Sequence, residues 1–122
     1  MLNRTEDKLQ ISCVRWFGLA YPKMKQLLMS FPAGFVFGGD KLKRMRTGAR
    51  MKSMSYQNGT PDLFLAYPTR IHSGLWIEMK TEKGKIQPSQ KEMMEKLLVA
   101  GYHCVVCRSF DEFKNEIENY LK

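Results

Sequence analysis

Two residues that could act on a phosphate ester stand two positions apart in the middle of the chain. They are Glu78 and Lys80, in the mainly apolar segment Leu75-Trp-Ile-Glu78-Met-Lys80-Thr81. Because side chains on a strand alternate between its two faces, this pair would share one face with Trp76, while the apolar residues between them would face a core. An isolated Glu-x-Lys is usually a solvent-facing part of a sheet, so the tripeptide alone predicts little.

A second carboxylate, Asp62, opens the preceding apolar segment, directly after the turn Asn58–Pro61. Such an aspartate often only stabilises a turn. If the segments that begin at Asp62 and Leu75 pair as a hairpin, however, Asp62 approaches Glu78, and two carboxylates repel each other unless a cation lies between them. Oxygen ligands suit Mg²⁺ or Mn²⁺. The pattern therefore predicts a divalent metal, with Lys80 beside it to orient a water or to stabilise charge on a phosphate.

Hydrophobic spacing predicts the helices and strands that would position this group. The predicted helices cover about Thr5–Leu19, Asp40–Met54, Pro88–Ala100 and the residues after Ser109. The predicted strands cover Leu27–Phe31, Asp62–Tyr67, Leu75–Thr81 and Tyr102–Arg108. The helix between the last two strands predicts a parallel crossover. We therefore expect an α/β fold with a mixed central sheet flanked by helices, in a single domain over 1–122.

Local signals also mark the ends of these helices. Asn3 with Glu6, and Ser109 with Glu112, are spaced as capping boxes. Gly101 is placed to end its helix in the left-handed conformation. Apolar stripes that would pack on the sheet are Met94, Leu97 and Leu98 in one helix and Phe113, Ile117, Tyr120 and Leu121 in the last.

The charge of the chain favours a polyanionic partner. Its 20 Lys+Arg against 12 Asp+Glu give +8, although a basic protein without such a partner is the alternative. The 40–54 helix and the segment after Lys80 hold the residues that we interpret as contacts to backbone phosphates: Lys41, Lys43, Arg44, Arg46, Arg50, Lys52, Lys83, Lys85 and Lys91. A solvated helix face is the other interpretation of the basic helix.

The cysteines and the hydropathy bear on the compartment. Cys13, Cys104 and Cys107 cannot all pair within one chain, and strand alternation would put the last two on opposite faces, so we expect buried free thiols and a reducing compartment. No apolar run approaches the ~20 residues that span a bilayer. The N-terminus has no signal-peptide core. We expect no membrane contact and a cytoplasmic protein, in a bacterial or phage-infected host cell.

Four segments together resemble a known nuclease family. They are Gly59-Thr-Pro-Asp62-Leu-Phe-Leu, Gly74-Leu-Trp-Ile-Glu78-Met-Lys80-Thr, Gly84-Lys-Ile-Gln-Pro-Ser-Gln90-Lys and the later Leu97…Gly101-Tyr102. The combination is similar to the virus-type replication-repair nuclease (VRR-NUC) domain of the PD-(D/E)xK superfamily, in its stand-alone phage and bacterial form, from about Glu6 to the C-terminus. The chain departs from it at Pro32-Ala33-Gly34, where relatives often carry Pro-Asn-Gly, and at Ser55-Tyr56, where a glycine is usual. Neither departure removes a catalytic residue.

The resemblance implies a restriction-endonuclease-like core and a set of site residues. Asp62 and Glu78 would bind Mg²⁺ or Mn²⁺ together with the carbonyl of Met79, and Lys80 would be the catalytic lysine. Gln90 would be the supporting polar residue beside the site, or otherwise an ordinary first-turn residue. Glu6 would reach the metal directly or through water, or otherwise only close a capping box.

The function implied is a metal-dependent DNA endonuclease, structure-selective for Holliday junctions or flap-like substrates and acting as a homodimer in DNA repair. A nucleic-acid-binding module that keeps the fold without cutting is one alternative, and a restriction-type enzyme that reads a sequence is another. Apolar candidates for the dimer surface are Leu19, Tyr21 and Phe35-Val-Phe37.

Overall fold

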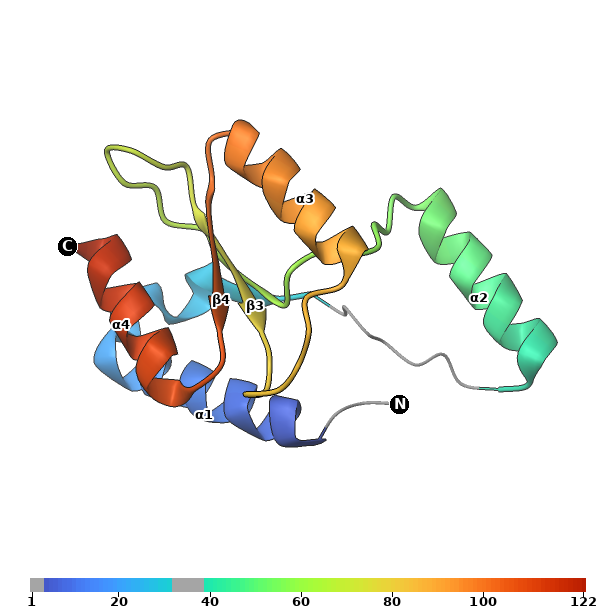
Figure 1. Cartoon of the computed structure of the whole chain (residues 1–122), viewed down its shortest axis with the longest axis horizontal. Coiled ribbons are helices and arrows are strands. Elements are labelled where there is room, and N and C mark those ends of the chain that lie inside the picture. The colour runs from blue at the N-terminus through green and yellow to red at the C-terminus, as the bar shows by residue number, and fades with distance from the viewer. Residues whose placement is uncertain (1–3, 32–38) are drawn as a thin grey trace.

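A four-stranded mixed sheet forms the centre of the computed structural model, which describes residues 4–31 and 39–122 (Figure 1). The strands lie in chain order, as β1 (Leu28–Ser30), β2 (Leu63–Leu65), β3 (Leu75–Met79) and β4 (His103–Cys107). β1, β2 and β3 pair antiparallel, and β3 pairs parallel with β4. The predicted hairpin, the parallel crossover and the α/β class are therefore confirmed.

Helices account for most of the remaining described chain. They are α1 (Arg4–Ala20), the 3₁₀ helix η1 (Pro22–Leu27), α2 (Lys41–Ser53), α3 (Pro88–Val99) and α4 (Phe110–Leu121). The α-helices agree with their predicted bounds to within about two residues. The strands are shorter than predicted, above all β2, and η1 is not predicted, although Pro22 suits the first turn of a helix.

The hydrophobic core lies between the sheet and the pair α1 and α4. Alternate residues of β2 and β3 face it, as the period of a strand requires. The fully buried members are Leu63, Leu65, Leu75, Ile77 and Met79 of the sheet, Cys13 and Phe17 of α1, Cys107 of β4, and Phe113 and Ile117 of α4. Of the stripe predicted for α4, Tyr120 is buried and Leu121 partly so.

The opposite face of the sheet carries α3 and a layer of aromatic side chains. The ring of Trp76 stacks on that of Phe64 at 4.4 Å between centroids and lies 6.4 Å from that of Tyr102. No residue of α3 is buried, and Leu98 is 50% exposed. The predicted stripe of α3 was wrong at Leu98, because α3 contacts the sheet mainly along β4 at its edge.

The helix ends are fixed by a few hydrogen bonds. The Ser109 hydroxyl accepts from the N–H of Glu112, but the Glu112 carboxylate accepts from the N–H of Arg108 and not from that of Ser109, so the predicted capping box is only half formed. Gly101 has a φ of +101°, as predicted for the residue that ends α3. Asn3 lies outside the described residues, so its pairing with Glu6 stays a prediction.

Helix α2 stands apart from the rest of the molecule (Figure 1), and none of its residues is buried. Asp40 caps its first turn by accepting from the N–H of Lys43. At its C-terminal end the N–H of Tyr56 donates to Met51 O and that of Ser55 to Lys52 O, the two bonds of a Schellman motif. Ser55 has a φ of +73°. The usual glycine that this chain replaces by Ser55-Tyr56 therefore coincides with a left-handed backbone position.

Three further predictions concern the cysteines, the apolar surface candidates and the membrane. Cys13, Cys104 and Cys107 are free, although Cys104 is only partly buried. Tyr21 is only partly buried, with its ring against that of Phe17 at 5.3 Å, so its place in a dimer surface stays a prediction. Leu19 is exposed, and Phe35–Phe37 lies outside the described residues. None of the helices within residues 4–31 and 39–122 is long and apolar enough to cross a membrane.

Candidate active site

The register of the hairpin places Asp62 opposite Glu78. Leu63 pairs with Ile77 in an antiparallel register, so Asp62, which precedes Leu63, lies next to Glu78, which follows Ile77. Both carboxylates lie on the aromatic face of the sheet, opposite the core, since their strand neighbours Leu63 and Ile77 face α1 and α4. Glu78 is 1% exposed, and Asp62 and Lys80 are also buried. The sheet therefore collects three ionisable groups in one buried place.

Hydrogen bonds fix the position of Asp62 and of the end of β3. The Asp62 Oδ2 atom accepts from the N–H of Met79 at 2.7 Å, which ties the start of β2 to β3. The N–H of Lys80 donates to Cys107 O at 3.0 Å and so continues the parallel pairing with β4. The Lys80 Nζ atom then lies 4.0 Å from Glu78 Oε2. The ammonium and the two carboxylates are thus held by the backbone of the sheet.

Two helices add one side chain each to this group. Glu6, in the first turn of α1, brings a carboxylate oxygen to within 4.8 Å of carboxylate oxygens of Asp62 and Glu78. Gln90, in the first turn of α3, donates from Nε2 to Glu78 Oε2 at 3.3 Å. Its Oε1 atom accepts from the N–H of Gln87 at 2.8 Å. Gln90 therefore serves the helix end and the carboxylate at the same time.

Gly59 permits the approach of α3 to this place. Its φ is +81°, and a Cβ atom on it would lie 2.3 Å from Ser89 O and 2.9 Å from the nitrogen of Gln90. Any side chain would push the first turn of α3 away from the turn that leads to Asp62. The glycine of the Gly-Thr-Pro-Asp segment is thus required by both conformation and space.

The electrostatics of the group show an excess of negative charge. Burial, and after it the charge of Asp62, raises the pKa of Glu78 to about 9, against the opposing effect of Lys80. Burial also raises the pKa of Asp62, although the Met79 N–H and Lys80 act in the other direction. The pKa of Glu6 is raised by burial and by Asp62. One ammonium does not compensate three carboxylates that lie this close.

The donor set fits a divalent cation. The Glu78 Oε1 atom is buried and has no hydrogen-bond partner within the described part of the chain. Two carboxylates this close need either a proton on one of them or a cation between them, and a bound cation would make that proton unnecessary. Carboxylate oxygens from Glu6, Asp62 and Glu78 are the hard ligands that Mg²⁺ and Mn²⁺ prefer.

Arg108 braces the turn that follows Lys80, and the sequence pattern did not single it out. Its Nη1 atom donates to the carbonyl oxygens of Thr81, Glu82 and Gly84. Its position directly after β4 and before the Ser109 cap is the signal that could have identified it, since parallel strands end at the same edge of a sheet. Arg108 thereby shapes the connection between β3 and α3.

The predicted phosphate contacts are exposed but not gathered in one place. Lys83 and Lys85 flank Gly84, whose backbone lies against the Lys80 side chain in the segment after β3 that Arg108 braces. The six basic residues of α2 are exposed as well, on the helix that stands apart from the sheet (Figure 1). The structure therefore separates one basic element from the carboxylate cluster and keeps another beside it.

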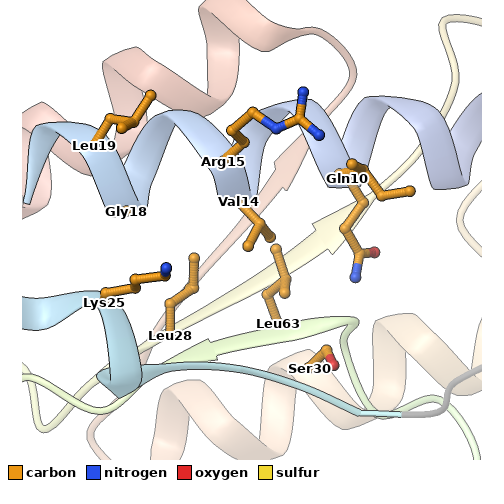
Figure 2. Close-up of a pocket in the computed structure, with 10 residues that line it drawn as sticks. Gln10, Val14, Arg15, Gly18, Leu19, Lys25, Leu28, Ser30 and Leu63 are labelled. Atoms are coloured by element: carbon orange, nitrogen blue, oxygen red, sulfur yellow. The ribbon is translucent and has the colours of Figure 1, made fainter. Parts of the chain in front are cut away.

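A cavity of about 530 Å³ lies on the other side of the sheet, between α1 and β1 (Figure 2). Val14, Leu28 and Leu63 point toward one another across it, and Gln10, Arg15 and Lys25 lie at its edges. Leu63 faces away from Asp62 along β2. The cavity includes none of the three carboxylates, so the candidate active site is defined by the carboxylate cluster and not by this cavity.

A family model and a solved structure both identify the same domain family for this chain. The VRR-NUC domain model matches residues 6–111. A solved structure described as a VRR_NUC domain protein superposes with a TM-score of 0.80 at 26% sequence identity, over 99% of this chain and 91% of that one. No curated protein matches the chain. The matched segment contains every carboxylate of the cluster, and Lys80 and Gln90 as well.

Proposed function

We propose that this chain, which belongs to the VRR-NUC family of nucleases, is an Mg²⁺- or Mn²⁺-dependent endonuclease that cuts branched DNA. The observation that carries the proposal is the cluster of Glu6, Asp62 and Glu78, with a buried, unpartnered oxygen on Glu78 and Lys80 beside it. A binding module has no need of three carboxylates beside a polyanion, because they would repel it. A divalent cation resolves that conflict.

Each residue of the cluster has a separate task in this proposal. Asp62, Glu78 and the Met79 carbonyl hold the cation, and Glu6 does so directly or through a water. When bound, the cation supplies the positive charge that activates a phosphodiester toward attack by water. Lys80 donates to the attacking water or to a phosphate oxygen on which charge accumulates. Gln90 keeps the Glu78 carboxylate oriented through its amide hydrogen bond.

Basic residues would hold the DNA without reading its sequence. In this proposal Lys83 and Lys85 contact phosphates near the cut. The basic residues of α2 contact a more distant part of the DNA: Lys41, Lys43, Arg44, Arg46, Arg50 and Lys52. Phosphate contacts carry no base information, so a substrate defined by its structure, such as a junction or a flap, is favoured. A homodimer would match the symmetry of a four-way junction.

The decisive experiment is cleavage of end-labelled junction, flap, single-strand and duplex DNA with Mg²⁺ or Mn²⁺. The wild type should cut at least one branched substrate in a metal-dependent way, and Lys80→Ala should lose about 100-fold or more in rate, as for other groups that stabilise transition-state charge. Lys114→Ala, at an exposed lysine of α4, is the matched control and should behave as the wild type.

Other outcomes would replace the proposal by one of its alternatives. If the wild type and Lys80→Ala bind DNA equally and neither cuts it with either metal, the protein is a binding module that keeps the nuclease fold. Discrete fragments from plain duplex DNA would instead identify a restriction-type enzyme.

A further inference from the structure

An aromatic side chain lies beside the carboxylate cluster and has no part in the proposed metal site. Phe31 follows β1, and its N–H donates to Asp62 O at 2.9 Å, which continues the pairing of β1 and β2 by one residue. Strand alternation puts its side chain on the same face of the sheet as that of Asp62. The Phe31 side chain is 37% exposed.

The ring of Phe31 packs on the aromatic layer of the same face of the sheet. Its centroid lies 5.2 Å from that of Trp76, although Trp76 is on β3 and the two strands are separated by β2. Trp76 stacks in turn on Phe64. Phe31 itself lies beside Asp62 in the sheet, and its ring reaches across β2 to Trp76, which precedes Glu78 by two residues on the same strand face. The ring is thus an exposed surface on a packed aromatic layer.

Such a ring has a natural ligand at a site that binds phosphodiesters. A nucleobase is attached one sugar away from the phosphate, and bases stack on aromatic side chains with little dependence on their identity. A base inside a duplex is already stacked on both neighbours, and taking it out requires unstacking and unpairing. A nucleotide that is unpaired before it binds avoids that penalty.

We propose that Phe31 stacks on the base of a nucleotide next to the scissile phosphate, so that the site selects DNA that is unpaired at the cut. The inference rests on the proposed nuclease function and names its substrate class: single-stranded segments, flaps and the open branch points of junctions. The selection is made at the chemical site itself, whereas the phosphate contacts of α2 would be common to all DNA.

The test removes the ring and the base separately and together. The cut position is first mapped on an end-labelled flap, and the nucleotide on either side of it is then replaced by an abasic tetrahydrofuran residue. On the intact flap, Phe31→Ala should lower kcat/KM roughly 5- to 150-fold, the range for one base stacked on an aromatic side chain. On the flap that lacks the stacked base, the wild type should already be slow, and Phe31→Ala should slow it no further.

Two control variants separate stacking from an effect on the fold. Phe31→Trp keeps an aromatic surface and should retain cleavage of the intact flap within a few-fold of the wild type. Met29→Ala removes another exposed side chain, 41% accessible, from the same strand face but one residue pair farther from Asp62. It should leave the rate and the preference for unpaired DNA unchanged.

Each remaining outcome is decisive. If Phe31→Ala slows the intact and abasic flaps by the same factor, or if the wild type cuts paired and unpaired nucleotides equally well, the inference is wrong while the nuclease function stands. If the folded wild type cuts none of the DNA substrates with Mg²⁺ or Mn²⁺, the proposed function fails, and the inference fails with it.

Discussion

At the scale of single residues, the buried carboxylates make the metal-free protein sensitive to pH. Burial raises the pKa of Glu78 from its ordinary 4.5 to about 9. Below 4.5 the carboxyl is protonated in the folded and the unfolded protein alike. As the pH rises above that value, the unfolded chain releases the proton and the folded protein keeps it, so the free energy of unfolding falls until the pH passes the folded pKa.

With a chelator present, the melting temperature should therefore decrease between pH 7 and pH 8, and Mg²⁺ or Mn²⁺ should raise it more at the higher pH. Glu78→Gln should flatten the pH dependence and abolish the shift caused by metal. His103 acts in the opposite direction and mainly below pH 7, because burial lowers its pKa in the folded protein from the ordinary 6.5. A melting temperature that is equally pH-dependent in the wild type and in Glu78→Gln would contradict the assignment.

Ser55 offers a second prediction at this scale. It holds a left-handed φ at the end of α2, where a Cβ atom costs roughly 1–2 kcal/mol and glycine does not meet that penalty. Part of the gain from Ser55→Gly is offset by the greater freedom of glycine in the unfolded chain. The variant should protect the amides of the last turn of α2 about 2- to 5-fold more strongly from hydrogen exchange, for a net gain of about 0.5–1 kcal/mol.

Ser53→Gly is the matched control, because Ser53 lies in the last helical turn of α2 and not in a left-handed position. Glycine within a helix is unfavourable, so this variant should lower protection of the same amides. Equal effects of the two substitutions would show that the conformation of Ser55 does not determine the end of the helix.

At the scale of elements, the connection from β3 to α3 depends on Arg108. Three carbonyl oxygens of one turn accept from a single guanidinium nitrogen, and this turn joins the strand that carries Glu78 to the helix that carries Gln90. A displacement of about 1 Å in such a framework can cost about 100-fold in rate. Arg108 is thus a positioning residue and touches no reacting group.

Arg108→Lys should lower kcat about 10- to 100-fold, since one ammonium does not reproduce the planar guanidinium that holds the turn. DNA affinity should fall less than kcat, because the phosphate contacts proposed for α2 are unaffected and only Lys83 and Lys85 lie in the loosened turn. Arg70→Ala, at an exposed arginine of the loop between β2 and β3, should change neither value. A loss of affinity equal to the loss of kcat would instead place Arg108 in DNA binding.

At the scale of the whole molecule, the carboxylate cluster and the basic helix α2 lie in different parts of the structure. The sheet carries the carboxylates, and α2 carries six of the 20 basic residues of the chain without one acid. Replacing Lys41, Lys43 and Arg44 by Gln should weaken binding to all DNA structures alike. The slope of log Kd against log salt concentration should decrease by about 0.7–0.9 for each DNA phosphate that the variant no longer neutralises.

Arg70→Gln combined with Lys114→Gln and Lys122→Gln, at three exposed basic residues outside α2, is the control with the same change of net charge. These substitutions should leave the salt slope unchanged if α2 makes the phosphate contacts. Equal reductions would show that only the net charge of the protein matters.

The sequence predicts much of the fold and of the candidate site where one local rule decides the outcome. Alternation along β3 puts Glu78 and Lys80 on the face opposite Ile77, and the helix before β4 requires a parallel strand. Prediction from the sequence fails where the packing of several distant elements determines the structure. Leu98 fits the stripe of α3 but remains half exposed because of where α3 meets the sheet, and η1 depends on packing against α1.

Residues that act across strands were the hardest to find. Arg108 is one of many arginines by sequence, and its hydrogen bonds to Thr81, Glu82 and Gly84 arise only because β3 and β4 end together. Phe31 reaches Trp76 over an intervening strand, which no spacing in the chain reports. Glu6 and Gln90, in contrast, were found through the resemblance to a family and not through spacing.

The pairing of Ser30 with Leu63 has a consequence for engineering. Because these two residues are neighbours in the sheet, the connection from β1 to β2 begins and ends at adjacent points of the sheet. Connections of this kind can be exchanged with little effect on the scaffold. Replacing residues 39–56 by a segment that recognises a chosen nucleic acid, while Gly59 and Asp62 are kept, would therefore turn the domain into a cleavage module with an interchangeable targeting arm.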